Sequence, residues 1–180
     1  MNLTPERQAE YEAHLIWLDD HNTGMRLNWH GAILINIDLS DADLSSADLR
    51  TANLNGANLS NATLRNVFLT DAKLNGANLS WATMYFAHLS GARMKGANLN
   101  SATLMNADLS CTDLMDADLT DAQLSGTNLR LADLTQAKLI RADLSDASLL
   151  MASLLRADLT GAKLSRANRI LARLGGAKGL

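Results

Sequence analysis

Residues 41–65 read DADLS SADLR TANLN GANLS NATLR, five successive blocks of five residues in which leucine is always the fourth. Counted from the residue two before this leucine, the same frame runs without insertion or deletion from Leu27 to Arg166, which makes 28 blocks. The central residue is leucine in 25 of them and Trp29, Met84 or Met94 in the others. Two residues earlier stands alanine in 23 blocks. A repeat this regular decides the fold class.

The five-residue period indicates strands and excludes a helix. Five residues advance an α-helix by about 500°, which would scatter the leucines around its axis. In a strand, alanine and leucine two residues apart point to one face, and the Asp, Asn or Thr between them points to the other. The remaining two positions are rich in Ser, Asn, Asp, Gly and Thr, which favour turns. Each block is therefore a short strand followed by a turn, and the block pattern fits a coil with three or four sides.

The tandem motif A-(D/N)-L-x-x resembles the signature of the pentapeptide-repeat family over residues 27–166. The run His14–Trp17–Leu18, followed by Gly24, is similar to the leader segment of bacterial members. The resemblance implies an all-β solenoid, a right-handed quadrilateral β-helix with four blocks in each 20-residue coil. The 28 blocks would then form about seven coils, roughly 34 Å long at the usual spacing of paired strands.

The sequence divides into an N-terminal helical cap (1–26), the β-helix (27–166) and a C-terminal helix or tail (167–180). For the first helix, Thr4 is a suitable N-cap, and Pro5 suits the first helical position. Helical spacing places apolar residues and one histidine on a single face that would cover the end of the solenoid. These residues are Tyr11, His14, Leu15 and Leu18.

At the C-terminal end the repeat fails at Arg169, where a central leucine is expected. Ser165 can cap a helix that ends at Gly175–Gly176. Its apolar residues and several outward positions of the last coils would form one surface, made of Leu131, Leu150, Met151, Leu155, Ile170, Leu171 and Leu174. Either this helix folds back onto its own rod, or the surface forms a two-fold homodimer. The family resemblance adds that gyrase-binding members dimerise through their C-terminal segments.

The leading candidate for a functional site is a group of exposed aromatic residues. Trp81, Tyr85 and Phe86 occupy turn positions of one coil, and the predicted stacking places Arg65 and Met105 on either side of Tyr85. Trp, Tyr and Arg are the residues most enriched at binding hot spots. These five residues predict a surface for a protein partner, on a rod that is not an enzyme.

A second candidate is an acidic band made of Asp108, Asp113, Asp116, Asp118 and Asp121. The sequence has no lysine or arginine between Lys95 and Arg130. Family members that occupy the DNA-binding saddle of DNA gyrase use rows of carboxylates to imitate DNA phosphates. The resemblance therefore implies an alternative function as a DNA mimic directed at gyrase or another type II topoisomerase. This chain differs from those members in its uninterrupted coils, its lack of Phe at central positions and its mild net charge of −3.

Other classes of function find no support in the sequence. It contains no arrangement of nucleophile, base and acid, and no phosphate-binding loop. His14 with His21 or His30 does not complete a ligand set, so we expect no metal and no cofactor. The net charge argues against direct nucleic-acid binding, and the lack of a long apolar run argues against a membrane span. The start of the sequence does not resemble a signal peptide, and Cys111 is the single cysteine, so we expect a cytoplasmic location.

Overall fold

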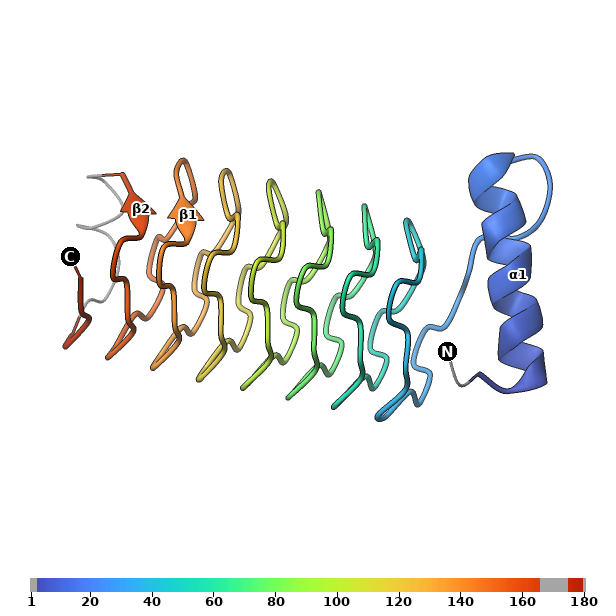
Figure 1. The fold of residues 1–180 in the computed structure, drawn as a ribbon, viewed down its shortest axis with the longest axis horizontal. Coiled ribbons are helices and arrows are strands. Elements are labelled where there is room, and N and C mark those ends of the chain that lie inside the picture. The colour runs from blue at the N-terminus through green and yellow to red at the C-terminus, as the bar shows by residue number, and fades with distance from the viewer. Residues whose placement is uncertain (1–2, 166–174, 180) are drawn as a thin grey trace.

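The computed structural model describes residues 3–165 and 175–179. The chain forms a straight stack of coils, with one helix across its N-terminal end (Figure 1). This helix, α1, spans Pro5–Asp19. Two short strands, β1 (Asp143–Leu144) and β2 (Lys163–Leu164), pair in parallel near the other end. Among the described residues, no helix combines the length and apolar character needed to cross a membrane.

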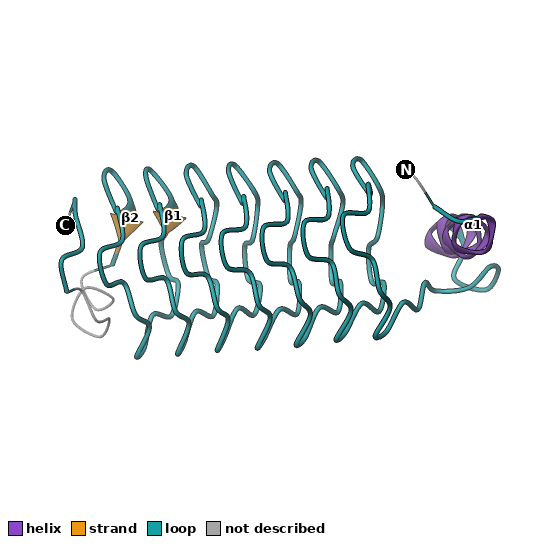
Figure 2. Cartoon of the chain, turned by 90° about the horizontal axis from the view of Figure 1, so that it is seen from below, coloured by secondary structure: helices purple, strands orange, loops and turns teal. Residues whose placement is uncertain are grey.

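Successive coils are joined by parallel bridges between residues that lie 20 apart. Thr63 pairs with Thr83, and Thr83 pairs with Thr103; the same spacing holds along the whole stack. Each coil therefore contains four blocks and has four sides, and the coils follow one another at a regular interval (Figure 2). We call these the first to fourth sides, which begin with the blocks centred on Trp29, Leu34, Leu39 and Leu44. The two residues after each side form the corner of the same number.

The interior follows the predicted register. Each central residue from Trp29 to Leu159 is buried, and so is each residue two positions earlier from Ile37 to Ala157. Thr112 and Thr127 occupy two of the places usually filled by alanine. Their hydroxyl groups donate to the carbonyl oxygens of Leu89, at 3.2 Å, and Leu104, at 3.0 Å, in the preceding coil. The polar exceptions inside the rod are thus hydrogen-bonded, as burial requires.

Each corner is a tight turn with a left-handed residue. At the first corner the amide of Ala32 donates to the carbonyl oxygen of Trp29 at 3.0 Å, and later blocks repeat this bond. In all four corners, the second of the two residues has a positive φ, from Gly31 to Gly161. This is the conformation that a type II turn requires, and Gly, Asn and Asp adopt it at the lowest cost. The repeat therefore selects its turn residues for backbone conformation.

Three hydrogen bonds attach α1 to the first coil. The Leu27 amide donates to Nδ1 of His14 at 3.1 Å, and the Asp43 amide donates to the hydroxyl of Tyr11 at 3.0 Å. Nε1 of Trp29 donates to a carboxylate oxygen of Glu10 at 2.6 Å. Tyr11 and His14 are buried as predicted, but Leu15 is 40% exposed. The expectation that Leu15 belongs to the covering face is wrong.

Gly24 allows the chain to turn back from α1 to the first coil. Its φ is +68°, and a Cβ atom at this position would lie 2.4 Å from the carbonyl oxygen of Ala13. Any other residue would therefore collide with the backbone of the helix. The close return positions Leu27 and Trp29, which begin the solenoid.

Residues 175–179, which were assigned to a tail, resume the ladder at the C-terminal end. The Arg156 amide donates to the carbonyl oxygen of Gly175 at 2.9 Å, and Asp158 bridges Lys178 in parallel. The expected C-terminal helix, with Ile170, Leu171 and Leu174, lies outside the described residues. The spacing between Asp158 and Lys178 is the normal 20 residues. A sequence signal for this return was present, because Ala167, Ala172 and Ala177 keep the five-residue interval.

Candidate functional site

An aromatic ridge flanks the fourth side of the rod. It consists of Arg65, Trp81, Tyr85, Phe86 and Met105. Trp81 is on the third corner, and Tyr85 and Phe86 are on the fourth corner of the same coil. Trp81 is 64% exposed and Phe86 is 54% exposed. Between them lies the outward residue Thr83. The ridge therefore presents two aromatic edges beside a narrow strip of threonine.

The neighbouring coils hold this ridge in place. The guanidinium carbon of Arg65 lies 5.7 Å from the centre of the Tyr85 ring, a cation–π contact between successive coils. The Asn66 amide donates to the carbonyl oxygen of Tyr85 at 2.9 Å, and the Phe86 amide donates to that of Met105 at 3.2 Å. The predicted stacking of Arg65, Tyr85 and Met105 thus agrees with the structure. A shallow hollow lies along Arg65, Asn66, Tyr85 and Phe86.

The surroundings of Trp81 are regular and rigid. On the third side, Nδ2 of Asn78 donates to Oδ1 of Asn58 at 3.3 Å, and Nδ2 of Asn98 donates to Oδ1 of Asn78 at 3.1 Å. On the fourth side, Thr83 pairs with Thr63 and Thr103 through backbone bridges. Trp81 therefore projects from an edge between an asparagine ladder and a threonine column, both fixed by the solenoid.

The two most exposed rings of the ridge occupy unfavourable backbone positions. Trp81 has φ +62° and Phe86 has φ +56°. The left-handed conformation costs a residue with a side chain about 1–2 kcal/mol, and a bulky residue is rarely found there. Exposure of the rings in water adds a further penalty. Strain of this kind tends to persist at sites where a side chain has a function.

Next to the fourth corner, the first side carries a second aromatic contact. The rings of Phe68 and His88 stack with their centres 4.8 Å apart and their planes 6° from parallel. The guanidinium of Arg26 lies 5.5 Å from the centre of the Phe68 ring. The stacking of Phe68 on His88 follows from the 20-residue coil, whereas the contribution of Arg26 does not. Arg26 precedes the repeats, so their period does not place it.

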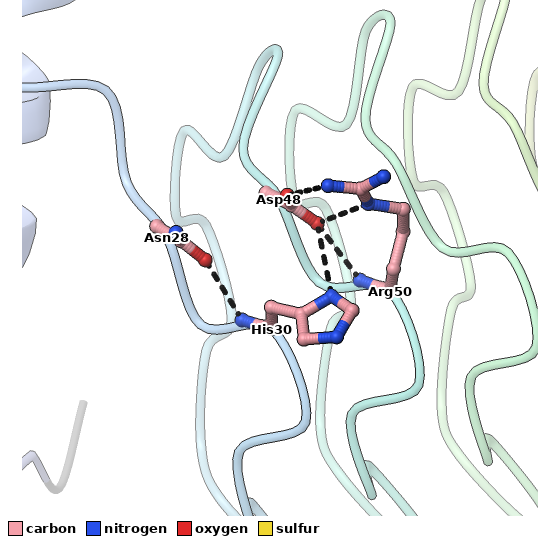
Figure 3. Close-up of polar contacts among 4 residues, drawn as sticks. All are labelled: Asn28, His30, Asp48 and Arg50. Carbon is pink, nitrogen blue, oxygen red and sulfur yellow. Dashed lines mark hydrogen bonds and ion pairs between the residues drawn. The ribbon is translucent and has the colours of Figure 1, made fainter.

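The first side also contains a nearly buried carboxylate (Figure 3). Nε of Arg50 donates to Oδ1 of Asp48 at 2.9 Å, and Nδ1 of His30 lies 3.9 Å from the same oxygen. The His30 amide donates to Oδ1 of Asn28 at 3.1 Å. The hydrogen bonds from Arg50 hold the pKa of Asp48 below its usual value. This cluster joins the first two coils, and it includes His30 but not His14, which belongs to α1.

The acidic band is a partial ring around one coil, and cations from neighbouring coils neutralise part of it. Nζ of Lys95 lies 3.8 Å from Asp116, and Nζ of Lys138 lies 3.6 Å from Asp118. Nε of Arg141 donates to Asp121 at 2.7 Å, which lowers the pKa of that carboxyl group. The stretch of sequence without lysine or arginine is therefore not without cations in space, because the 20-residue coil brings basic residues of the neighbouring coils beside it.

The other two residues of the band have different surroundings. A carboxylate oxygen of Asp108 accepts a hydrogen bond from Nδ2 of Asn128 at 2.9 Å. Asp113 accepts the Met115 amide at 3.1 Å, within its own turn, and has no ion pair in the described part of the chain. The band thus combines paired and unpaired carboxylates on three sides of the rod.

The described part of the C-terminal apolar patch consists of Leu131, Leu150, Met151 and Leu155. Leu131 and Met151 stack on the first corner, both exposed and both at positive φ. The Leu131 amide donates to the carbonyl oxygen of Leu150 at 3.0 Å. Leu155 lies on the second corner, and a Cβ atom on Gly175 would come within 2.7 Å of its Cδ2. The structure therefore brings these four residues to one end of the rod.

An apolar surface near α1 was not predicted from the repeat pattern. Ile33 and Ile35, on the second side and the second corner, are both exposed. They line a shallow depression with Thr4 and Arg7. The signal was present in the sequence, because Ile33 occupies a middle position that usually carries Asp, Asn or Thr.

Comparison with known proteins places the repeats in a family. A model described as pentapeptide repeats, in 8 copies, matches residues 28–61, 52–85, 84–121 and 117–149. A comparison with curated proteins gave no match. Among solved structures, HetL from the cyanobacterium Nostoc sp. strain PCC 7120, described as involved in heterocyst differentiation regulation, is 30% identical. That match covers 84% of this chain and 86% of HetL, with a TM-score of 0.33.

Two further solved structures are similar to this chain. A pentapeptide repeat protein from the thylakoid lumen of Arabidopsis thaliana is 27% identical over 53% of this chain and 70% of that protein, with a TM-score of 0.44. QnrB1, described as a plasmid-mediated fluoroquinolone resistance protein, is 21% identical over 86% of this chain and 85% of that protein, with a TM-score of 0.43. The chain belongs to the pentapeptide repeat family, whose members fold as right-handed quadrilateral β-helices.

Proposed function

We propose that this protein is a non-catalytic scaffold that binds a protein partner through the aromatic ridge. One observation carries the proposal: Trp81 and Phe86 are exposed on backbone positions that disfavour bulky side chains. Two rings retained against both strain and exposure are best explained by a contact that buries them. The α1 helix and seven coils of 20 residues would serve as a rigid support for this contact.

The chemistry of the ridge suits a protein surface. Aromatic and arginine side chains dominate binding hot spots because they bury a large area with few rotatable bonds. Arg65 over Tyr85 supplies a charged group at the rim, and Met105 supplies an adaptable apolar contact. The expected binding energy is therefore mainly apolar and should depend little on salt.

A cross-linking experiment tests this function. A photoreactive amino acid at Thr83, in the strip between the rings, would identify the partner in the producing cells. Binding of the purified partner would then be compared for the wild type, Trp81→Ala/Tyr85→Ala and Asp113→Asn/Asp116→Asn/Asp118→Asn. We expect the aromatic variant to lose at least about tenfold in affinity, one hot-spot residue being worth 2 kcal/mol or more. Unchanged affinity of the aromatic variant would contradict the proposal.

The second candidate is a DNA mimic directed at DNA gyrase. The unpaired carboxylate of Asp113 favours it, whereas the pairing of Asp116, Asp118 and Asp121 with cations disfavours it. A mimic of DNA needs exposed negative charge, and its binding should weaken as ionic strength rises. A gyrase supercoiling assay, with and without a fluoroquinolone, tests this function. If the three Asp→Asn changes abolish an effect on gyrase while the aromatic variant retains it, the second candidate replaces the first.

Two expectations from the sequence accompany this proposal. The cytoplasmic location stays a prediction, and imaging of a tagged chain would test it. The C-terminal apolar patch also stays a prediction, either as the seat of a folded-back segment or as a dimer contact. Its exposed leucines and Met151 support an apolar contact at that end.

A further inference from the structure

The second side of the rod separates its charges along the long axis. Its outward residues form one bridged column. From the N-terminal to the C-terminal end this column contains Ile33, Asn53, Lys73, Arg93, Asp113, Asp133 and Ser153. Two cations are thus followed by two carboxylates in consecutive coils. The middle of this side carries a basic half and an acidic half of equal length.

The four charges of this column are unpaired, in contrast to several charges on the third and fourth sides. Lys138 and Lys163, on the third and fourth sides, lie 3.6 Å and 3.1 Å from carboxylates of the preceding coil. Within residues 3–165 and 175–179, none of the four second-side charges takes part in an ion pair. Asp113 and Asp133 accept hydrogen bonds from the amides of Met115 and Thr135, in their own turns. Lys73 and Arg93 are exposed to solvent.

The alternation of charge fits a second copy of the same surface in the reverse direction. Consider a two-fold axis that runs across the face of the second side, at right angles to the rod, between Arg93 and Asp113. It would place Arg93 opposite the partner's Asp113. The same operation would place Lys73 opposite the partner's Asp133. Because a two-fold axis repeats every contact, four complementary pairs would form. We propose that the second side is the interface of an antiparallel homodimer.

The shape of the surface supports this arrangement. A shallow groove at the centre of the second side is lined by Arg93, Lys95, Cys111 and Asp113, at the position of the proposed axis. On the second corner, a Cβ atom added to Gly76 or Gly96 would meet nothing within 4 Å, so the two glycines leave open space beside the column. A flat partner can therefore approach the column closely. The reverse direction also brings the exposed Ile33 and Ile35 of one copy to within about one coil of the partner's Leu155.

Charge complementarity favours a second copy over other occupants. An acidic ligand would match Lys73 and Arg93 but would be repelled by Asp113 and Asp133. A basic ligand would meet the opposite problem. A partner must carry both signs in reverse order at the spacing of the coils, and the second side itself meets this requirement. The dimer leaves the fourth sides facing outward in opposite directions, so two aromatic ridges would be available to a multivalent partner.

Two complementary charge variants provide the main test. Lys73→Glu/Arg93→Glu makes the column uniformly acidic, and Asp113→Lys/Asp133→Lys makes it uniformly basic. We expect a concentration-dependent dimer of the wild type by analytical ultracentrifugation, and a monomer of each variant alone. An equimolar mixture of the two variants should form a heterodimer, because every facing pair is then opposite in sign. Lys138→Glu/Lys163→Glu, with the same change in net charge on other sides, is the matched control and should remain a dimer.

The single cysteine gives a second readout in the native protein. Cys111 is exposed on the first corner beside the proposed axis. The two thiols of the dimer would lie on the order of 10 Å apart, the usual separation of facing sheets. A short bifunctional maleimide should therefore link two copies of the wild type and the mixed variants. It should not link either variant alone or Cys111→Ser.

Salt dependence and one further variant separate this interface from a C-terminal contact. A dimer held by exposed ion pairs should dissociate as ionic strength rises, because salt screens such pairs. Met151→Glu, in the C-terminal apolar patch, should leave the second-side dimer intact. Loss of dimer in Met151→Glu, with dimer retained in both charge variants, would overturn the proposal. A wild type that stays monomeric at high micromolar concentration in low salt would also overturn it, and would leave the proposed binding function untouched.

Discussion

Along the inside of the rod, each central residue from Trp29 to Leu159 is apolar and buried. By contrast, the second residue of each corner ranges from glycine to tryptophan. The inside accepts three residue types at its central position, because a narrow interior leaves no room for variation. The corners instead require a backbone conformation, and most residues there are Gly, Asn or Asp. The buried positions of the repeat therefore specify the fold. Outside, Trp81 and Phe86 depart from the rule of the corners, and these two departures are the basis of the proposed binding surface.

The largest expected effect breaks the rule of the inside. Leu104 is fully buried in mid-rod, so Leu104→Asp would place a carboxylate without a partner in the core. We expect a loss of about 4 kcal/mol or more in the free energy of unfolding. The neighbouring Thr103 faces outward, and Thr103→Asp should cost about 0.5 kcal/mol or less. Urea denaturation measures both values, and similar midpoints for the two variants would contradict the register.

A smaller effect of opposite sign tests the corners. Phe86 lies between Asn66 and Asn106 in one column of left-handed residues, and Asn61 occupies the place before Trp81. Asparagine tolerates this conformation, so Phe86→Asn and Trp81→Asn should each raise the free energy of unfolding by about 1 kcal/mol. The same changes should weaken partner binding. Calorimetry measures the stability, and a drop in melting temperature would mean that ring packing outweighs the backbone strain.

The smallest effect concerns the His14 imidazole, at the end of the rod that α1 covers. Burial lowers the pKa of His14, against an opposing contribution from Asp43 and with support from Arg26. Nδ1 of His14 accepts a hydrogen bond from the Leu27 amide, and its buried Nε2 has no hydrogen-bond partner among the described residues. As pH falls below about 6.5, the unfolded chain takes up a proton that the folded chain resists, so stability should decrease.

Thermal melting between pH 7 and about pH 5 measures this decrease. His14→Gln, which keeps an acceptor for the amide, should show a flatter profile than the wild type. His88→Gln, on the outer surface, is the control and should keep the wild-type slope. The lowered pKa values of Asp48 and Asp121 contribute only near and below pH 4, outside this window. An identical slope for His14→Gln would show that another group is responsible.

The features that depend on the five-residue repeat could be predicted from the sequence. The sequence predicted the buried register, one turn in each five-residue block and, through Thr4 and Pro5, the start of α1. It did not predict the exposure of Leu15, because the helix touches the coil end through only part of its apolar face. It also missed the cations that pair with the acidic band, such as Lys138 and Arg141. These lie 20 residues away in the chain but side by side in the structure.

The candidate site was predictable as a set of residues but not as a strained surface. The stacking of Arg65 on Tyr85 follows from the 20-residue coil. The positive φ of Trp81 does not follow from composition, because most other members of that position are small or polar. Similarly, the ordered charges of the second side become visible only when Lys73, Arg93 and Asp113 are placed in one column.

The uniform 20-residue spacing of the bridges has a consequence for how the protein is made. In a chain of 180 residues, this spacing corresponds to a relative contact order of about 0.1, a value typical of helical bundles. We therefore expect folding far faster than that of most β-rich proteins. Because α1 is synthesised before the coils and is hydrogen-bonded to the first of them, each new coil can add to a finished template as it leaves the ribosome. Assembly would proceed in one direction, and unfolding would start from the opposite end.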